Sequence, residues 1–370
     1  MLYFLAQHYN YKLSRNLKKA VQLTDRLIEM SPKTYDYVMT KARIAKHNGN
    51  TAGAARLMNE ARELDLKDRY INTKCAKYQL RDDQNRSALE TMSKFTRNET
   101  VGGTLGDLVD MQCMWYLTED GAAYARQQQY GLALKRYHAI HDIFETWQED
   151  QFDFHNFSFR KGQIRAYMAM LRWEDGLREH PYYVRAAVAA ARIYVTLHDR
   201  PDVARDGYIP GLARMSDADA KRAQKNLRKE RERADKEDAE RIDADKKAAA
   251  KKANASADEG AKKLDTDLRG RALVETKDPL GQAMRFLQPL MDLGVGVLEA
   301  QHVGFDVYTR RGKLLSFPPF IMLVLDRRPQ TDIPRFRETL SGAQVPRRRL
   351  LPLQRRPHHT PSSHAFPVDM

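Results

Sequence analysis

Two histidines, His138 and His141, have a type and a spacing that could bind a metal ion. Positions three apart lie on one face of a helix, and imidazole nitrogens are common zinc ligands. A zinc site needs three or four ligands, and no third ligand follows at a suitable spacing. The two cysteines, Cys75 and Cys113, form no Cys-x-x-Cys pair, so we expect reduced thiols and no metal centre. We interpret both histidines as packing and surface residues.

The stretch Gln128–Ala133 is a second candidate for chemistry. Its letters match (Gln/Arg)-x-x-Gly-x-(Gly/Ala), a loop whose backbone N–H groups hold the pyrophosphate of acetyl-CoA in acetyltransferases of the GNAT type. Here the motif lies at a predicted turn between helices, with no preceding strand, and it is short and degenerate. No G-x-S-x-G elbow or Walker-type glycine loop is present. We therefore expect a non-enzymatic chain, and acetyl-CoA binding by the isolated chain would favour the acetyltransferase alternative.

The helices predicted to carry these residues belong to an internal sequence repeat. Ala20, Ala54 and Ala88 are 34 residues apart, which is the period of tetratricopeptide repeats, each a pair of antiparallel helices. Asn48–Asn50 and Asp82–Asn85 are the predicted turns within two of the pairs. A fourth pair follows over about 114–140, and residues 163–180 and 181–199 are predicted as two further helices. We expect residues 1–200 to form an all-α superhelix whose concave face binds a partner.

The composition changes at about residue 200. The chain has a formal net charge of +14, which favours acidic partners such as RNA, and no stretch is apolar and long enough to span a membrane. Residues 201–270 are predicted as a charged linker or insertion, because 220–253 have no apolar stripe and can form only a solvated helix or a disordered segment. One interpretation is a spacer, and the other is a contact with ribosomal RNA phosphates. The candidate residues for that contact are Lys221, Arg222, Lys225, Arg228 and Lys229.

The C-terminal part divides in two. Residues 271–315 are predicted as a further helical pair of the array. Residues 316–370 are rich in proline and arginine and have no helical periodicity, so we expect an irregular, disordered tail or the product of an aberrant gene model.

The least generic stretch is Glu149–Ala187. It begins with aromatic and acidic residues, and if 152–159 are extended, the alternating Phe152 and Phe154 lie on one side. Buried aromatics are typical interface anchors, and the alternative is that they fill the core between repeats. This stretch resembles the auxiliary subunit of the NatA N-terminal acetyltransferase complex. The resemblance covers about Met1–Leu315, a middle portion of that subunit, and its motifs are Asp150–His155, Arg160–Lys161, Arg165–Tyr167, Leu177–Tyr183 and Ile193–Val195.

The resemblance implies a non-catalytic scaffold in the cytoplasm that anchors a GNAT-type catalytic subunit to the ribosome for co-translational N-terminal acetylation. Acetyl-CoA would belong to that partner, and inositol hexakisphosphate can bind between the two subunits in this family. The residues expected at the partner interface are Phe152, Asp153, Phe154, His155, Tyr167, Tyr182 and Tyr183. The residues expected around the inositol phosphate are Lys135, Arg136, Arg160, Lys161 and Arg165, because clustered Arg and Lys pair with phosphate oxygens. The alternative function is a general tetratricopeptide scaffold, such as a chaperone adaptor.

Overall fold

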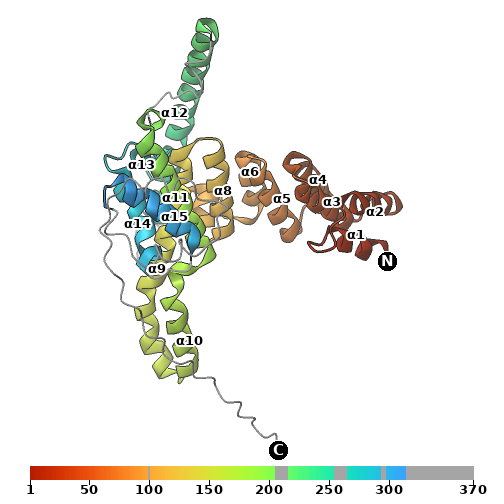
Figure 1. The fold of residues 1–370 in the computed structure, drawn as a ribbon, viewed down its shortest axis with the longest axis horizontal. Coiled ribbons are helices and arrows are strands. Elements are labelled where there is room, and N and C mark those ends of the chain that lie inside the picture. Colours follow the sequence, from red (N-terminus) through yellow and green to blue (C-terminus); the bar gives the residue numbers. More distant parts are fainter. Residues whose placement is uncertain (99–100, 205–215, 254–264, 293–296, 314–370) are drawn as a thin grey trace, which may run out of the picture. The chain divides into compact units, whose positions relative to one another are not determined.

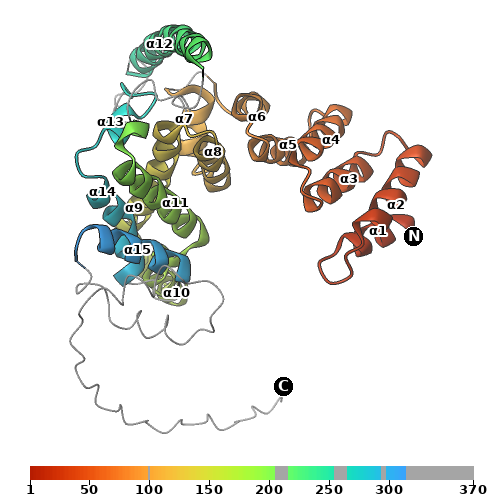
Figure 2. The same ribbon diagram turned by 45° about the horizontal axis from the view of Figure 1, so that its top comes forward.

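The computed structural model describes residues 1–98, 101–204, 216–253, 265–292 and 297–313. Every regular element within these ranges is a helix, and the helices follow one another as hairpins (Figures 1 and 2). The predicted all-α class is therefore confirmed for the part of the chain that the structure describes. The predicted irregular tail, residues 316–370, lies outside the described residues.

In the first three helical pairs, three helices begin at a short polar side chain that accepts a hydrogen bond from the first turn. These pairs are α1 (Leu2–Asn10) with α2 (Leu17–Met30), α3 (Tyr35–His47) with α4 (Thr51–Leu64), and α5 (Arg69–Arg81) with α6 (Asn85–Met92). Asn50 accepts a hydrogen bond from the Gly53 N–H at 2.8 Å, and Asp68 accepts one from the Tyr70 N–H at 2.6 Å. Such bonds satisfy N–H groups that have no partner inside the helix, and they favour the starts of α4 and α5 at these residues.

The turns and small residues of the repeat lie where the 34-residue period predicts. Gly49 adopts a left-handed conformation with φ of +81° between α3 and α4, and Asp83 adopts one with φ of +60° between α5 and α6. Aspartate tolerates this conformation better than most residues with a side chain. The repeated alanines are at most 1% exposed, because the paired helices approach closely there. They are Ala20, Ala54 and Ala88.

The array continues through five more helices. They are α7 (Gly103–Asp110), α8 (Met114–Arg126), α9 (Tyr130–Arg160), α10 (Ile164–Asp175) and α11 (Pro181–Asp199). The helix predicted over 163–180 ends early at Asp175, because Gly176 is a poor helix former and a short 3-10 turn leads to Pro181. Pro181 then starts α11, where its missing N–H costs no hydrogen bond.

The charged segment forms the long helix α12 (Asp217–Ala253), followed by α13 (Arg271–Val274), α14 (Pro279–Asp292) and α15 (Leu298–Arg310). Residues 217–253 of the charged segment are thus helical in the structure. The predicted late helical pair corresponds to α14 and α15, which both pack against α11. Phe286 of α14 is fully buried, and its ring lies beside those of His138 and Tyr194.

Candidate interaction surfaces

The two histidines lie where α9 packs against α11 and α14, His141 buried and His138 half-buried. His138 Nε2 is 2.8 Å from the Tyr194 hydroxyl, and burial lowers the pKa of His138 to about 4. His141 is 3% exposed and lies beside Asp142 and Glu145. Among the described residues, no group of three metal-ligating side chains occurs. Both imidazoles therefore contribute to packing in this structure.

The glycine of the stretch Gln128–Ala133 is covered by the protein's own backbone. Gln128 and Gln129 form the turn after α8, and Gly131 lies in the first turn of α9. A Cβ atom on Gly131 would lie 2.2 Å from the carbonyl oxygen of Arg269. The segment that precedes α13 therefore passes directly over this glycine. Carbonyl oxygens repel a pyrophosphate, and the stretch lacks the geometry of an acetyl-CoA loop.

The five residues predicted around an inositol phosphate do not meet. Lys135 forms an ion pair with Asp265, and Arg136 forms a buried ion pair with Asp120, with Nε and Oδ2 2.6 Å apart. Arg160 ends α9, 24 residues further along, which is about 36 Å of helix. The structure therefore does not bring Lys135, Arg136, Arg160, Lys161 and Arg165 into one pocket, because most of α9 lies between the first two residues and the other three.

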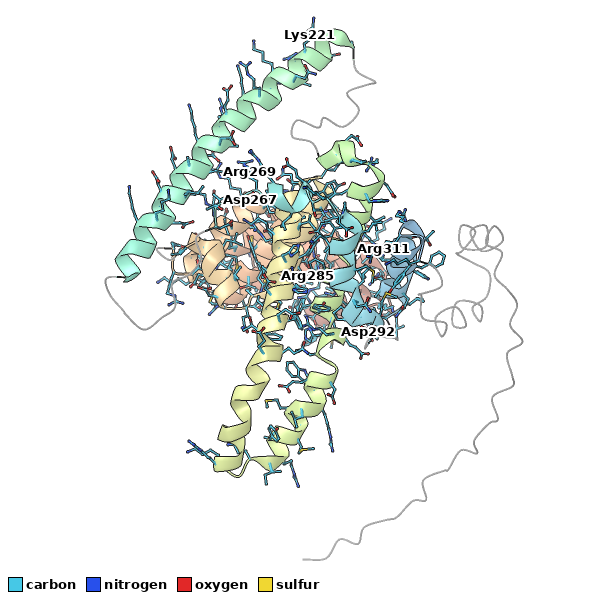
Figure 3. The ribbon with its side chains drawn as sticks, turned by 90° about the vertical axis from the view of Figure 1, so that its left-hand side faces the viewer. Lys221, Asp267, Arg269, Arg285, Asp292 and Arg311 are labelled. Carbon is cyan, nitrogen blue, oxygen red and sulfur yellow. The ribbon has the colours of Figure 1, made fainter. Side chains whose placement is uncertain are left out.

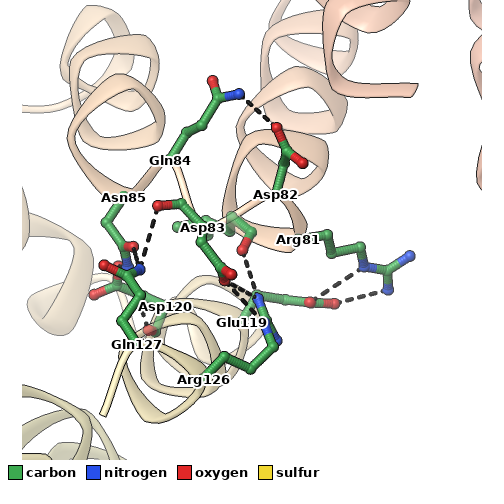
Figure 4. A network of polar contacts seen from close by, with 10 residues as sticks. Arg81, Asp82, Asp83, Gln84, Asn85, Glu119, Asp120, Arg126 and Gln127 are labelled. Carbon is green, nitrogen blue, oxygen red and sulfur yellow. Dashed lines mark hydrogen bonds and ion pairs between the residues drawn. The ribbon is translucent and has the colours of Figure 1, made fainter. Parts of the chain in front are cut away.

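A different group of basic side chains does meet, on α3 and α5. Burial is the largest cause that lowers the pKa of Lys46, and the positive charge of four neighbouring side chains lowers that pKa further. Lys77 and Arg81 share the carboxylate of Glu119, at 3.2 and 2.8 Å. Figure 4 shows the pairing of Arg81 with Glu119. One carboxylate does not neutralise so many cations, so this surface attracts anions. We call it the α3–α5 basic cluster, consisting of Arg43, Lys46, Lys74, Lys77 and Arg81.

Sequence reasoning missed this cluster although a signal was available. Its members recur at three- and four-residue spacing on the first helices of two successive repeats. Such spacing puts them on one face of each helix, and the repeat brings the two helices side by side. The sequence analysis searched instead near the aromatic stretch, where the lysines and arginines are close in number but distant in space.

The aromatic stretch is helical and not extended. Residues 151–160 belong to α9. The side chains of Phe152, Asp153, Phe154 and His155 lie outside the described residues. Further along, Tyr183 is 1% exposed and donates a hydrogen bond to the Phe286 carbonyl at 3.3 Å.

Two other residues predicted at the partner interface differ in exposure. Tyr167 is buried, and Tyr182 is half-buried and stacks on the ring of His180. Tyr167 and Tyr183 therefore do not form the surface contacts predicted for them, because both rings are buried within this chain. The exposed apolar side chains of this region lie on α10, where Ile164 and Met168 are 58% and 43% exposed.

The basic residues predicted to contact RNA are all exposed on one half of α12. Arg228 forms an exposed ion pair with Glu232 at 3.4 Å, one helical turn away. Figure 3 shows Lys221 near one end of α12, and Arg269 beside the helix at a distance from that end. The exposed set is Lys221, Arg222, Lys225, Arg228 and Lys229.

The fold and these surfaces define a helical-repeat scaffold with basic surfaces and without a catalytic constellation among its described residues. The family model for "N-terminal acetyltransferase A, auxiliary subunit" matches residues 1–318. The chain belongs to this family of auxiliary subunits, as the sequence resemblance predicted.

Individual relatives agree with the family match. The chain is 42% identical over 323 residues to mouse N-alpha-acetyltransferase 16, NatA auxiliary subunit, covering 85% of this chain and 36% of the relative. It is 38% identical to the Arabidopsis thaliana N-terminal acetyltransferase A complex auxiliary subunit NAA15, covering 85% and 34%. A solved structure of Naa15/Naa10 bound to HypK-THB matches with a TM-score of 0.66 and 41% identity, over 92% of this chain and 45% of that one. The chain thus spans about a third of the length of these curated relatives. In the described residues, no helix is long and apolar enough to cross a membrane.

Proposed function

We propose that this chain is a non-catalytic scaffold that binds the catalytic subunit of an N-terminal acetyltransferase. The observation that carries the proposal is the 41% identity and shared fold with a protein solved as Naa15/Naa10. In this function the helical array holds a GNAT-type enzyme in the cytoplasm, and acetyl-CoA binds to that enzyme. The residue ranges 1–200, 201–270, 271–315 and 316–370 are our proposed division into array, charged insertion, late helical pair and tail.

The exposed apolar side of α10 is the proposed contact for the catalytic subunit. Ile164 and Met168 are one turn apart and exposed. Exposed apolar side chains grouped on one helix mark interaction surfaces more often than isolated ones do. We expect the double substitution Ile164→Asp and Met168→Asp to abolish capture of the co-expressed catalytic subunit. The matched control is Leu13→Asp, an apolar residue that is 84% exposed in the loop between α1 and α2. Equal capture by both variants would refute this contact, whereas no capture by the native chain would refute the function.

The α3–α5 basic cluster is the proposed site for a polyphosphate of the inositol hexakisphosphate class. A lysine whose charge is opposed by four like charges gains when an anion binds, because the anion relieves that repulsion. Lys46→Glu is expected to remove binding of inositol hexakisphosphate in a calorimetric titration, whereas Lys12→Glu, at an exposed loop lysine, retains it. Binding that survives Lys46→Glu would place the ligand elsewhere.

The exposed basic residues of α12 are the proposed contact with ribosomal RNA. Each phosphate neutralised by a protein cation steepens the salt dependence of binding. Replacing Lys221, Arg222, Lys225, Arg228 and Lys229 by Gln should flatten the plot of log affinity for ribosomes against log salt concentration. The control replaces Lys246 and Lys247, which are exposed on the other half of α12. An unchanged slope in the five-residue variant would exclude the basic residues of α12 as the ribosome contact. Capture of chaperones alone, without ribosomes or an acetyltransferase, would favour the adaptor alternative.

A further inference from the structure

The charges of α12 are separated into two halves. Residues 221–233 contain seven basic and two acidic side chains, and we call them the basic segment. Residues 234–245 contain six acidic and two basic side chains. A spacer that only needs to be soluble and helical has no reason to separate its charges, because alternating signs stabilise a single helix better. The separation therefore requires an explanation beyond solubility.

The acidic half contacts the rest of the protein along one face. Asp235 pairs with Arg271 at 3.0 Å, and Asp238 pairs with Arg269. About two helical turns further along, Asp245 accepts a hydrogen bond from the Gly102 N–H at 2.8 Å and is 9% exposed. These contacts define the acidic face of α12, which consists of Asp235, Asp238 and Asp245.

Burial along α12 follows the same face. Ala234, Asp238, Ile242 and Asp245 are less exposed than the residues between them, at three- and four-residue spacing. The basic segment shows no such buried stripe among its described side chains. Side-chain contacts thus hold one half of the helix, and the other half extends from them by up to about 20 Å, since each residue adds 1.5 Å.

The partners of the acidic face are themselves fixed to the core. Asp267 accepts hydrogen bonds from the N–H groups of Arg271 and Ala272, at 2.9 Å each. The carbonyl oxygen of Asp267 accepts a hydrogen bond from Lys135 of α9, and Gly270 lies against the backbone of Gly131. Arg269 and Arg271 therefore present their guanidinium groups from a segment that is tied to α9.

We infer that Asp235, Asp238 and Asp245 are positioning residues, which fix the direction in which α12 presents its basic segment. The inference rests on the RNA contact proposed above for that segment. Acidic residues close to a nucleic-acid contact weaken it by repulsion. Pairing them with Arg269 and Arg271 offsets that repulsion and makes the basic segment a fixed arm. RNA bound to the segment would then take one orientation relative to the helical array.

The test measures the position of the arm directly by pulsed electron resonance on the full chain. Nitroxides are placed at Asn226→Cys in the basic segment and Arg192→Cys in α11, with Cys113→Ser, while Cys75 is fully buried and stays unlabelled. We expect one narrow distance distribution. Asp235→Arg with Asp238→Arg should broaden it, as should Arg269→Asp with Arg271→Asp. Combining all four substitutions restores opposite charges at unchanged net charge and should restore the narrow distribution.

A matched control separates position from charge. Glu237→Arg with Glu240→Arg makes the same charge change on exposed positions of the same helix and should leave the distribution narrow. A native distribution as broad as that of the reversed variants would overturn the inference. So would a combined variant that stays broad, because the aspartates would then act by something other than pairing.

A labelled RNA hairpin keeps this inference distinct from the RNA proposal. The Asp235→Arg, Asp238→Arg variant and the Glu237→Arg, Glu240→Arg control both gain positive charge, so both should bind the hairpin at least as tightly as the native chain. Only the control should retain a narrow distribution of energy-transfer efficiencies between a dye on the hairpin and a dye at position 192. If the two variants gave the same distribution of energy-transfer efficiencies, the inferred positioning role of Asp235 and Asp238 would be contradicted. If no variant binds the hairpin, the RNA contact fails, and the electron-resonance distances still decide whether the acidic face fixes the arm.

Discussion

The helices α3–α6 and the helix α12 are equally helical but are stabilised by different forces. In α3–α6, small and apolar side chains such as Ala54, Ala61 and Cys75 are at most 1% exposed in a shared core. The helix α12 has almost no apolar residues to bury and is held by ion pairs of partly exposed side chains. Close packing of apolar groups is not weakened by ionic screening, whereas exposed ion pairs are weak and screened. The array can therefore keep its structure under conditions that release α12.

The buried ion pair between α8 and α9 should give the largest effect on stability. Asp120 accepts hydrogen bonds from Arg136 at 2.6 Å and from Asn85 at 2.7 Å, and all three residues are buried (Figure 4 shows Asp120 and Asn85). Arg136→Met leaves the Asp120 charge without its partner, so we expect a loss of about 3–5 kcal/mol in the free energy of unfolding. Urea denaturation followed by circular dichroism measures it.

The control for that substitution is an exposed ion pair of the same array. Arg86 pairs with Glu90 at 3.3 Å, and its side chain is 92% exposed. Arg86→Met should change the free energy of unfolding by less than about 0.5 kcal/mol. If both variants lost the same stability, burial would not distinguish the two pairs, and the contrast between packed and exposed charges would fail.

The close approach of Gly131 and Gly270 predicts the next effect. A Cβ at Gly131 would lie 2.2 Å from the Arg269 carbonyl oxygen, so the backbone must move in Gly131→Ala. We expect a loss of about 1–3 kcal/mol, typical of overpacking. Gly176→Ala is the matched change, since its nearest neighbour is 3.7 Å away and its φ is −97°. A Gly131→Ala variant as stable as Gly176→Ala would show that the segment before α13 is not held against α9.

The core histidine gives the array a dependence on pH. Burial lowers the pKa of His138 to about 4, whereas an unfolded histidine titrates near pH 6.5. Between these values the unfolded chain binds the proton more readily, so stability falls as the pH decreases from 6.5 to 4. At pH 5.5 the loss from His138 is about 1.4 kcal/mol. His138→Gln should remove that part of the difference in unfolding free energy between pH 7.5 and pH 5.5, and an unchanged difference would exclude His138 as its source.

The sequence predicted the parts of this molecule that depend on local spacing. The 34-residue recurrence of Ala20, Ala54 and Ala88 placed the helical pairs, because each repeat has the same internal geometry. It could not place the basic pocket, since Arg136 and Arg160 are on one helix but far apart, whereas Lys46 and Lys74 are on different helices and close together. A charge count along the chain gives no distance in space. Nor could the pattern show that Arg136 is paired inside, because Asp120 lies on another helix.

The smallest expected effect on global stability comes from a substitution in α12. It tests whether this helix opens independently of the array. Ala239 is exposed on α12, and Ala239→Gly weakens helix formation locally by up to about 1 kcal/mol. The same change at the buried Ala54 also removes packing, and we expect it to lower the free energy of global unfolding by about 1–2 kcal/mol. Ala239→Gly should leave global unfolding within about 0.5 kcal/mol of the native value, because an arm held by side chains opens without opening the array.

Hydrogen exchange read by peptide mass spectrometry distinguishes the two regions in a single experiment. In Ala239→Gly, amides of α12 should exchange faster, with unchanged exchange in α3–α6. Raising the salt concentration to 1 M should increase exchange at residues 234–245 in the native chain as well, because screening weakens the ion pairs of Asp235 and Asp238. If Ala239→Gly instead accelerated exchange in α3–α6, α12 would be part of the same cooperative unit as the array. The difference between packed repeats and a charge-held arm would then not describe how this protein is stabilised.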